Sequence, residues 1–253
     1  MNELNELKGK TAIVTGGSRG LGYGVAEAFV EHGMNVVIAA SSSRVFEAEE
    51  KLQKLGCCKA YRIDLQNAEE RELFFKKSLA YLGGRLDVLA NIAGIQYRSP
   101  SEEFPLDQWQ KVLDINLTAV FHLCQLAGRV MLPQKSGKII NIASMLSFFG
   151  GLTVPAYAAS KGGIAQLTKA LSNEWAQYGI NVNALAPGYM ATEMNTALSS
   201  PDSPRYESIT ARIPAKRWGT EKDMKGPALF LASDLSNYLN GAVIPVDGGY
   251  LGC

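Results

Sequence analysis

The stretch Thr11–Gly24, TAIVTGGSRGLGYG, decides how the rest of the chain can fold. Its first five residues are apolar or β-branched and predict a buried strand, and the pattern after the glycines predicts a helix that ends at Gly33. Asn35–Ala40 (NVVIAA) predicts a second buried strand, parallel to the first. Strand, glycine turn, helix and parallel strand together form the unit that binds a mononucleotide.

The glycines of this turn are spaced Gly16-x-x-x-Gly20-x-Gly22. Glycines between a strand and a helix let the main chain approach a pyrophosphate at the helix N-terminus. Such a turn can also be purely structural, and only the surrounding strands and helix favour a nucleotide. The residues of the turn expected to contact the nucleotide are Gly16, Ser18, Arg19, Gly20, Leu21 and Gly22.

Strands and helices alternate along the rest of the chain. Further strands are predicted at Ala60–Ile63, Leu86–Ile92, Lys138–Ala143, Asn181–Ala186 and Ala242–Val246. Helices are predicted at Arg44–Leu55 (capped by Ser42 or Ser43), Asn67–Tyr81 (with an Asn67/Glu70 capping box), Leu106–Leu132, Tyr157–Trp175 and Thr220–Ala232. This order predicts an α/β fold, one domain over residues 1–253 with a doubly wound, Rossmann-type parallel sheet and helices on both faces. Residues 189–214 have a weak pattern and predict a lid over the substrate.

Residues at two strand ends should also meet the nucleotide. Asp64 follows the third predicted strand, where its carboxylate can accept a hydrogen bond from an adenine amino group or serve as a simple turn residue. After the fourth strand, Ala93 and Gly94 let the main chain pass close to a ligand. The site residues expected here are Asp64, Leu65, Asn91, Ala93 and Gly94.

Composition narrows the classes of function. The net charge is +1, so nothing in the electrostatics favours nucleic acid or a membrane as a partner. The N-terminal residues MNELNELKGK do not resemble a signal peptide, and we expect a cytoplasmic protein. The four cysteines lack C-x-x-C spacing and the chain has two histidines, which predicts reduced thiols and no metal site. The chemistry must then come from an organic cofactor or from side chains.

The segment Ser144–Lys161, SMLSFFGGLTVPAYAASK, carries side chains suited to proton transfer. Tyr157 and Lys161 are four residues apart and share one face of a helix. A lysine ammonium beside a phenol lowers the tyrosine pKa from about 10, so that the tyrosine can act as a general acid or base. The Ser144 hydroxyl could bond to the same substrate oxygen. Alone, such a Tyr–Lys pair is usually a solvated helix face, and the upstream nucleotide unit gives it weight.

Taken in order, these motifs resemble the short-chain dehydrogenase/reductase family over essentially the whole chain. They are the glycine turn, Asn116, Ser144, Tyr157-x-x-x-Lys161 and Pro187-Gly188. One departure is Asn91–Gly94, which reads NIAG where the family usually has NNAG. The order of motifs is far more specific than any one of them.

The resemblance implies a role for each matching residue. Tyr157 would be the general acid/base, and Ser144 would orient and polarise the substrate oxygen. Lys161 would bind the nicotinamide ribose and lower the tyrosine pKa, and Asn116 would hold a water in a proton relay. Pro187 and Gly188 would line the cofactor site, where Thr192 would contact the nicotinamide carboxamide.

Other phrases resemble the 2-dehydro-3-deoxy-D-gluconate 5-dehydrogenases and gluconate 5-dehydrogenases. They are SMLSFFGG (Ser144–Gly151), VPAY (Val154–Tyr157), NEWA (Asn173–Ala176), APGYMAT (Ala186–Thr192), RIPAKRWG (Arg212–Gly219) and VDGG (Val246–Gly249). This resemblance implies a small keto or hydroxy acid of the sugar-acid type as substrate, although the lid segment is longer than usual in those enzymes.

Cations in the predicted walls of the substrate site would suit a carboxylate. Arg98, Arg205 and Arg212 fall there, and an arginine fork binds a carboxylate bidentately. Met145 is a further expected substrate contact. Phe148, Phe149, Leu152 and Tyr97 would suit a less polar ketone, so a general carbonyl reductase or a 3-oxoacyl thioester reductase stays open. A non-catalytic nucleotide sensor is a more remote alternative, because every catalytic position is kept.

The end of the second strand bears on the choice of cofactor. NAD enzymes place an acid there to bind the ribose 2′-hydroxyl. Here that position is Ala40, followed by Ser41, Ser42, Ser43 and Arg44, with Arg19 in reach from the turn. The missing acid favours NADP(H) over NAD(H), with Ser41 and Ser42 among the contacts, although both arginines could simply be solvated.

The family resemblance also implies a homotetramer. One interface would involve the helix around Leu113–Leu132, with Phe121 and Leu126, together with the helix Tyr157–Gln177. The C-terminal strand and the tail to Cys253 would form the other. The same apolar residues could instead belong to the core.

Overall fold

A parallel sheet of seven strands organises the computed structural model, which describes residues 4–200 and 202–253. The strand order is β3-β2-β1-β4-β5-β6-β7. The strands are β1 (Thr11–Thr15), β2 (Asn35–Ala40), β3 (Cys58–Arg62), β4 (Val88–Asn91), β5 (Gly137–Ile142), β6 (Ile180–Pro187) and β7 (Val243–Val246). Because β1 pairs with both β2 and β4, the sheet grows in opposite directions from this point. The fold is therefore the doubly wound one that the sequence predicted.

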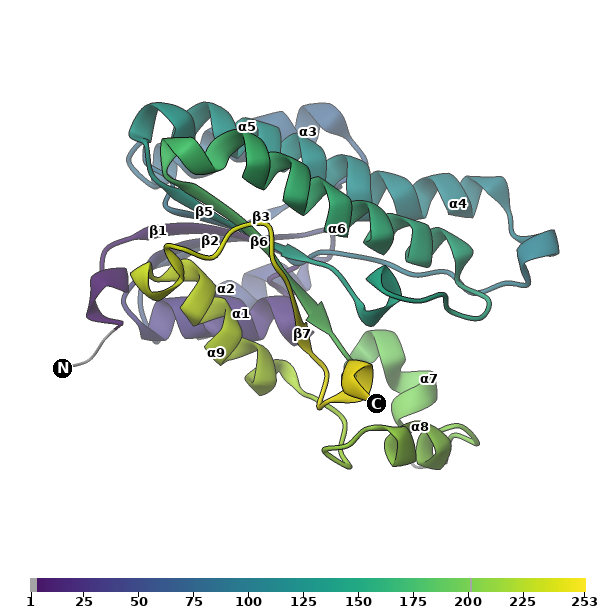
Figure 1. The fold of residues 1–253 in the computed structure, drawn as a ribbon. Helices are drawn as coiled ribbons and strands as arrows, with labels where there is room; N and C mark the ends of the chain where they lie inside the picture. The colour runs from purple at the N-terminus through teal and green to yellow at the C-terminus, as the bar shows by residue number, and fades with distance from the viewer. Residues whose placement is uncertain (1–3, 201) are drawn as a thin grey trace.

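Helices cover both faces of the sheet (Figure 1). They are α1 (Gly20–Glu31), α2 (Arg44–Gln53), α3 (Ala68–Tyr81), α4 (Leu106–Leu113), α5 (Ala119–Gln134), α6 (Pro155–Trp175), α7 (Thr196–Ser199), α8 (Tyr206–Arg212) and α9 (Glu221–Ala232). One face carries α1, α2 and α9, and the other carries α3, α5 and α6. Neighbouring residues of β1 serve the two faces in turn, since Val14 packs in the core with Phe29 of α1 and Ile13 in the core with Leu123 of α5.

The predicted elements are all present, with differences at their ends and in one helix. Asn67 caps α3, where its Oδ1 accepts from the main-chain N–H groups of Glu69 at 2.9 Å and Glu70 at 3.1 Å. The Glu70 carboxylate accepts instead from the N–H of Asp64 at 2.8 Å, so the capping box predicted at Asn67 is not reciprocal. The helix predicted at Leu106–Leu132 is interrupted by a π-helical turn, Asp114–Thr118, between α4 and α5.

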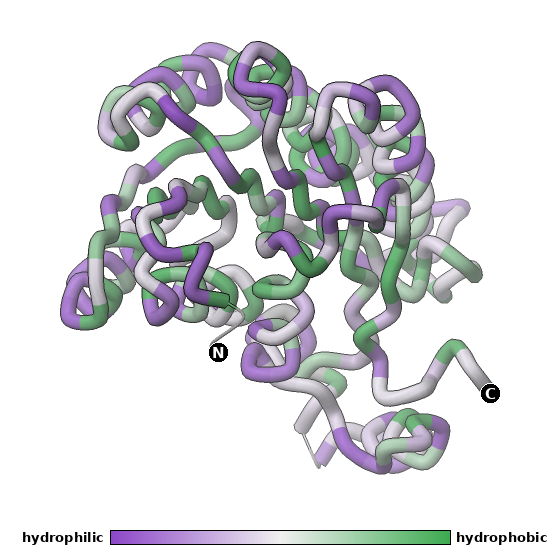
Figure 2. The backbone as a smooth tube through the Cα atoms, turned by 60° about the vertical axis from the view of Figure 1, so that its left-hand side comes forward, coloured by the Kyte–Doolittle hydropathy of each residue, from purple (hydrophilic) through white to green (hydrophobic). Residues whose placement is uncertain are grey.

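The helical stretch Leu106–Gln134 is the one part of the described chain that is long and apolar enough to cross a membrane. Of its most apolar window 56% is buried inside the fold, and Leu123, Ala127 and Met131 of α5 belong to the core. Figure 2 colours the chain by hydropathy: the strands in the interior are mostly hydrophobic, and the helices around them mix hydrophobic and hydrophilic residues.

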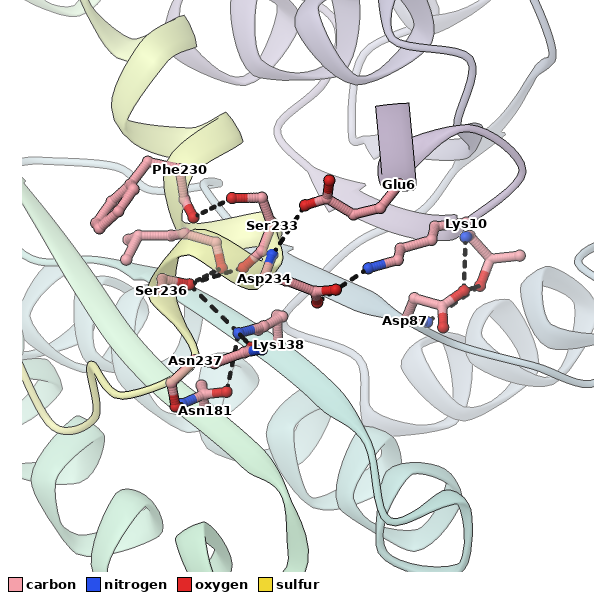
Figure 3. Close-up of polar contacts among 12 residues, drawn as sticks. Glu6, Lys10, Asp87, Lys138, Asn181, Phe230, Ser233, Asp234, Ser236 and Asn237 are labelled. Atoms are coloured by element: carbon pink, nitrogen blue, oxygen red, sulfur yellow. Dashed lines mark hydrogen bonds and ion pairs between the residues drawn. The ribbon is translucent and has the colours of Figure 1, made fainter. Parts of the chain in front are cut away.

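A buried lysine lies at the amino ends of the strands, whereas the cleft described below lies at their carboxyl ends. Lys138 of β5 is 8% exposed. Its Nζ donates to Asn237 Oδ1 at 2.7 Å, to Asn181 Oδ1 at 2.9 Å and to Ser236 Oγ at 3.3 Å (Figure 3). These bonds tie β5 and β6 to the turn that follows α9.

Candidate active site

A cleft of about 500 Å³ opens at the carboxyl ends of the strands, where the order of the sheet reverses. In open α/β sheets, ligands bind at this switch point. The predicted site residues that line the cleft are Gly16, Ser18, Arg19, Gly20, Leu21, Gly22, Ser41, Asp64, Leu65, Ala93, Gly94, Arg98, Ser144, Met145, Tyr157, Lys161, Pro187, Gly188, Thr192 and Arg205. Ser42, Asn91 and Asn116 are not among its lining residues.

The glycine turn packs too tightly for larger side chains. A Cβ on Gly16, whose φ is +74°, would lie 2.9 Å from the main chain of Ala93. A Cβ on Gly22 would lie 2.2 Å from the carbonyl oxygen of Gly16. These two glycines therefore let the turn pack tightly against Ala93 and the start of α1, and the turn lies in the wall of the cleft, where a dinucleotide pyrophosphate binds in this type of fold.

The end of β2 carries cations and no acid. Ala40 and Ser41 line the cleft, and the Nε of Arg62 donates to the carbonyl oxygen of Ser41 at 3.0 Å. The hydroxyl of Ser42 accepts from the N–H of Arg44 at 3.3 Å, and Ser42, a predicted cofactor contact, does not line the cleft. The carboxylate of Asp64 lines the cleft and also closes its own turn, because it accepts from the N–H of Gln66 at 2.9 Å.

Ser144 is held by the short turn that follows β5. Its Oγ accepts from the N–H of Leu146 at 3.2 Å, and its N–H donates to Ser147 Oγ at 3.2 Å. Ser147 in turn donates to the carbonyl oxygen of Lys161 at 2.6 Å. The turn is therefore fixed to α6, and Ser144 keeps its hydroxyl proton free for the Tyr157 side chain, to which it is hydrogen-bonded.

The prediction that Lys161 lowers the pKa of Tyr157 is wrong for this structure. Burial raises the pKa of Tyr157, and the two lesser, opposing influences are the Ser144 hydrogen bond and the positive charge of Arg98. The Nζ of Lys161 donates to the carbonyl oxygen of Ile142 at 2.6 Å. Burial also lowers the pKa of Lys161, to about 8. The lysine is thus a weak perturbant of the tyrosine, because its own charge is desolvated and directed elsewhere.

Asn116 lies in the π-helical turn and is fully buried. Its Nδ2 donates to the carbonyl oxygen of Ile95 at 2.8 Å and to Ser160 Oγ at 3.2 Å. Its Oδ1 accepts from the N–H of Ile95 at 2.9 Å. The amide therefore fixes the loop after β4 against α6, and π-helical turns often mark such functional positions.

Asn91 does not reach the cleft, contrary to its predicted place among the cofactor contacts. It is 2% exposed, and its Nδ2 donates to Asn141 Oδ1 at 3.0 Å and to Cys124 Sγ at 3.3 Å. Its register opposite Asn141 within the sheet turns the side chain towards α5. The loop is held instead by Thr15, whose hydroxyl accepts from the N–H groups of Ile92 at 3.1 Å and Ala93 at 3.2 Å.

The outer part of the cleft combines arginines with aromatic rings. Arg98, Arg205 and Arg212 all line it, and the Arg212 guanidinium lies 4.7 Å from the ring centroid of Tyr250. Met145 and Tyr250 belong to a small apolar cluster with residues of the lid. Residues 189–214, the predicted lid, are partly helical, since they contain α7 and α8, whereas the sequence predicted only a weakly ordered segment. Pro201 of the lid lies outside the described residues.

Sequence reasoning missed Tyr250 and Glu193, which also line this cleft. Glu193 follows Thr192 directly, and its carboxylate forms ion pairs with Arg19 and Arg44. An acid next to a motif residue could have signalled Glu193. The sequence has no comparable signal for Tyr250, because the C-terminal chain reaches the cleft only through tertiary packing.

Comparison with known proteins agrees with this geometry. The family model described as enoyl-(acyl carrier protein) reductase matches residues 16–251. The chain belongs to the short-chain dehydrogenase/reductase family. It is therefore a pyridine-nucleotide oxidoreductase that acts on CH–OH groups and the corresponding ketones, as the sequence predicted.

Individual relatives cover the whole chain. The 2-dehydro-3-deoxy-D-gluconate 5-dehydrogenase of Bacillus subtilis (strain 168) is 46% identical, over 99% of this chain and 98% of its own. The 5-keto-D-gluconate 5-reductase of Escherichia coli (strain K12) is 38% identical, over 99% of both. A crystal structure of a gluconate 5-dehydrogenase from Burkholderia cenocepacia, in complex with NADP and tartrate, has a TM-score of 0.92 at 35% identity and covers 99% of both chains.

Proposed function

We propose that this enzyme prefers NADP(H) and interconverts a small hydroxy acid of the sugar-acid type with its keto acid. The observation that carries the proposal is a proton-transfer pair, Ser144 and Tyr157, in the same cleft as Arg98, Arg205 and Arg212. Two relatives of full length carry names of gluconate-type enzymes, which supports the same substrate class. The arginines provide the charge that a small carboxylate needs.

The nicotinamide, when bound, supplies or accepts the hydride at the substrate carbon. The protein's own residues handle the proton. Because burial raises the pKa of Tyr157, its phenol is protonated at neutral pH and can donate to the oxygen of a ketone. Ser144 can donate to the same oxygen and stabilise negative charge on it. Lys161 lines the cleft beside them, and we assign to it the nicotinamide ribose.

The residues of the glycine turn and the β2 end fit a phosphorylated dinucleotide. Gly16 and Gly22 allow the tight turn at the cleft wall where we place the pyrophosphate, while Pro187, Gly188 and Thr192 line the part of the cleft assigned to the nicotinamide. The absence of an acid at Ala40, with Arg19 and Arg44 close by, supports NADP(H) over NAD(H). A crystal structure similar to this fold contains NADP. Comparable kcat/KM values for NADH and NADPH would contradict the preference.

A substitution of the arginines tests the substrate class. We expect Arg98→Ala and Arg205→Ala to raise KM for an acidic substrate at least about tenfold, the loss typical of a charged hydrogen bond, and to spare a neutral ketone. Arg129→Ala, which removes an exposed arginine of α5, is the matched control. If acidic and neutral substrates respond alike, or only neutral ketones react, a general carbonyl or 3-oxoacyl thioester reductase is the better description. Met145 and Phe149 in the cleft wall would suit such a substrate.

We further propose that the enzyme is a cytoplasmic homotetramer. The support for assembly is apolar surface on the helices that the family resemblance implicates. Phe121 of α5 is 44% exposed. At the C-terminal side, Tyr238 is fully exposed. Large apolar side chains in contact surfaces between subunits become buried on assembly, which favours association.

A further inference from the structure

Glu193 closes the lid onto the cofactor end of the cleft. Its carboxylate pairs with the guanidinium of Arg19 in the glycine turn and, at 3.2 Å, with that of Arg44 at the start of α2. The preceding lid residue, Thr192, lies against the same turn, because a Cβ on Gly20 would be 3.7 Å from Thr192 Cγ2. The Glu193 carboxylate thus binds both Arg19 and Arg44, the two arginines near the end of β2.

These are the two arginines that the proposed function assigns to the 2′-phosphate of NADP(H). A phosphate in this place would meet a carboxylate of like charge, and the arginines would already be paired. The three side chains are each more than half exposed: 57% for Arg19, 55% for Arg44 and 57% for Glu193. Exposed ion pairs of this kind are weak, so a doubly charged phosphate can displace the carboxylate.

We propose that Glu193 determines cofactor specificity, as an internal counter-ion that occupies the 2′-phosphate subsite and must leave when NADP(H) binds. This inference rests on the proposed NADP(H) site. NAD(H) has no 2′-phosphate and can bind while the carboxylate stays, with its 2′-hydroxyl able to donate to Glu193. Glu193 therefore reduces the preference for NADP(H) over NAD(H) that Arg19 and Arg44 create.

The test compares fragments of the two cofactors on the full-length protein. Binding of adenosine 2′,5′-bisphosphate and of 5′-AMP is measured by calorimetry for the wild type and for Glu193→Gln. We expect the variant to bind the bisphosphate about threefold to tenfold more tightly, the range expected for weak exposed ion pairs, and 5′-AMP within about twofold of the wild type. Glu207→Gln, which removes the same charge from an exposed position of α8, should change neither affinity.

A second pair of variants shows whether the effect acts through the arginines. In a chain that carries Arg19→Gln and Arg44→Gln, adding Glu193→Gln should no longer strengthen binding of the bisphosphate. An unchanged affinity in Glu193→Gln alone, or an equal gain for both fragments, overturns the inference. Failure of the proposed cofactor preference gives a different result, namely a wild type that binds both fragments equally. A gain confined to the bisphosphate in Glu193→Gln would then still support the role of Glu193.

Discussion

The Nζ of Lys161 lies 5.6 Å from the centroid of the Tyr157 ring, one helical turn away on α6. Burial nevertheless shifts their pKa values in opposite directions. It raises the pKa of the Tyr157 phenol and lowers the pKa of the Lys161 ammonium to about 8. At neutral pH the protein therefore holds a protonated phenol beside a largely charged lysine. This arrangement favours proton donation to a ketone oxygen over proton removal from an alcohol.

Replacement of Tyr157 by Phe removes the proton donor and little else. We expect Tyr157→Phe to lower kcat for ketone reduction at least about a hundredfold, the usual size of a general acid contribution. Cofactor affinity and thermal stability should stay near those of the wild type. Steady-state kinetics and calorimetric titration with NADPH check the two expectations. Activity within tenfold of the wild type would remove Tyr157 from its assigned role.

The raised pKa of Tyr157 predicts opposite pH profiles for the two directions. Alcohol oxidation needs an ionised Tyr157, so its kcat/KM should rise with pH above neutrality. Ketone reduction needs the protonated phenol, so its kcat/KM should be level at neutral pH and fall as the pH rises through the raised pKa of Tyr157. Profiles measured in both directions in constant-ionic-strength buffers test this. Two profiles that change in the same sense would show that Tyr157 does not control the proton transfer.

Much of the fold followed from the sequence because its signals are local. The run of apolar or β-branched residues in β1, the glycine turn and the alternation of later elements can be recognised from neighbours only a few positions away. The seven strands were predicted within two residues at each end. The π-helical turn at Asp114–Thr118 was not predicted, because its cause is the bonding of Asn116 to Ile95 and Ser160. Such distant partners leave no periodic signal in the chain.

Fewer of the site residues could be predicted from the sequence, because contacts between residues far apart in the chain leave no local signal. Motif residues such as Ser144 and Tyr157 line the cleft, because their positions depend on strand and helix ends. Asn91 was misplaced because the face that a strand residue presents depends on the register of the sheet. Glu193 was missed because its partners, Arg19 and Arg44, are more than a hundred residues away in the chain.

Asn116 is predicted to be a positioning residue for the loop after β4. Asn116→Ala leaves the N–H and carbonyl of Ile95 and the hydroxyl of Ser160 without this partner. Unsatisfied buried polar groups cost about 1–3 kcal/mol each, so we expect a clear loss of thermal stability together with weaker NADPH binding. Denaturant unfolding and cofactor titration measure both. Gln110→Ala on the exposed side of α4 is the control, and an Asn116 variant as stable as that control would contradict the role.

Phe121 is predicted to lie in a subunit interface. The wild type should show a light-scattering mass of about four times the 27.3 kDa chain. Phe121→Asp places a charge on the surface of α5, and we expect it to shift the mass towards smaller species because a buried, unpaired charge is costly. Leu73→Asp, at an exposed apolar position of α3, is the matched control. A wild-type mass equal to one chain would rule out assembly.

Lys138 should make stability depend on pH in an unusual direction. Burial lowers the pKa of its ammonium from 10.5 to about 8. Between these two values the unfolded chain binds a proton that the folded chain has lost, so the free energy of unfolding rises with pH in this window. Below a pH of about 8 both states are protonated, and the folded protein bears the full cost of burying the charge. Its hydrogen-bond partners are the neutral oxygens of Asn181, Ser236 and Asn237, and the carboxylates of Asp234 and Glu6 offset the cost of burial only in part (Figure 3).

Lys138→Met tests this argument, because it keeps an unbranched chain and removes the titrating group. The variant leaves two buried acceptors, Asn181 Oδ1 and Ser236 Oγ, without this donor, so we expect it to be less stable at neutral pH by about 1–3 kcal/mol. The loss relative to the wild type should grow as the pH rises from about 8 towards 10, since only the wild type gains from deprotonation of Lys138. Urea unfolding at several pH values measures the difference, and Lys135→Met in the exposed turn before β5 is the control. A difference between Lys138→Met and wild type that stays constant over this range would show that Lys138 keeps its proton in the folded protein.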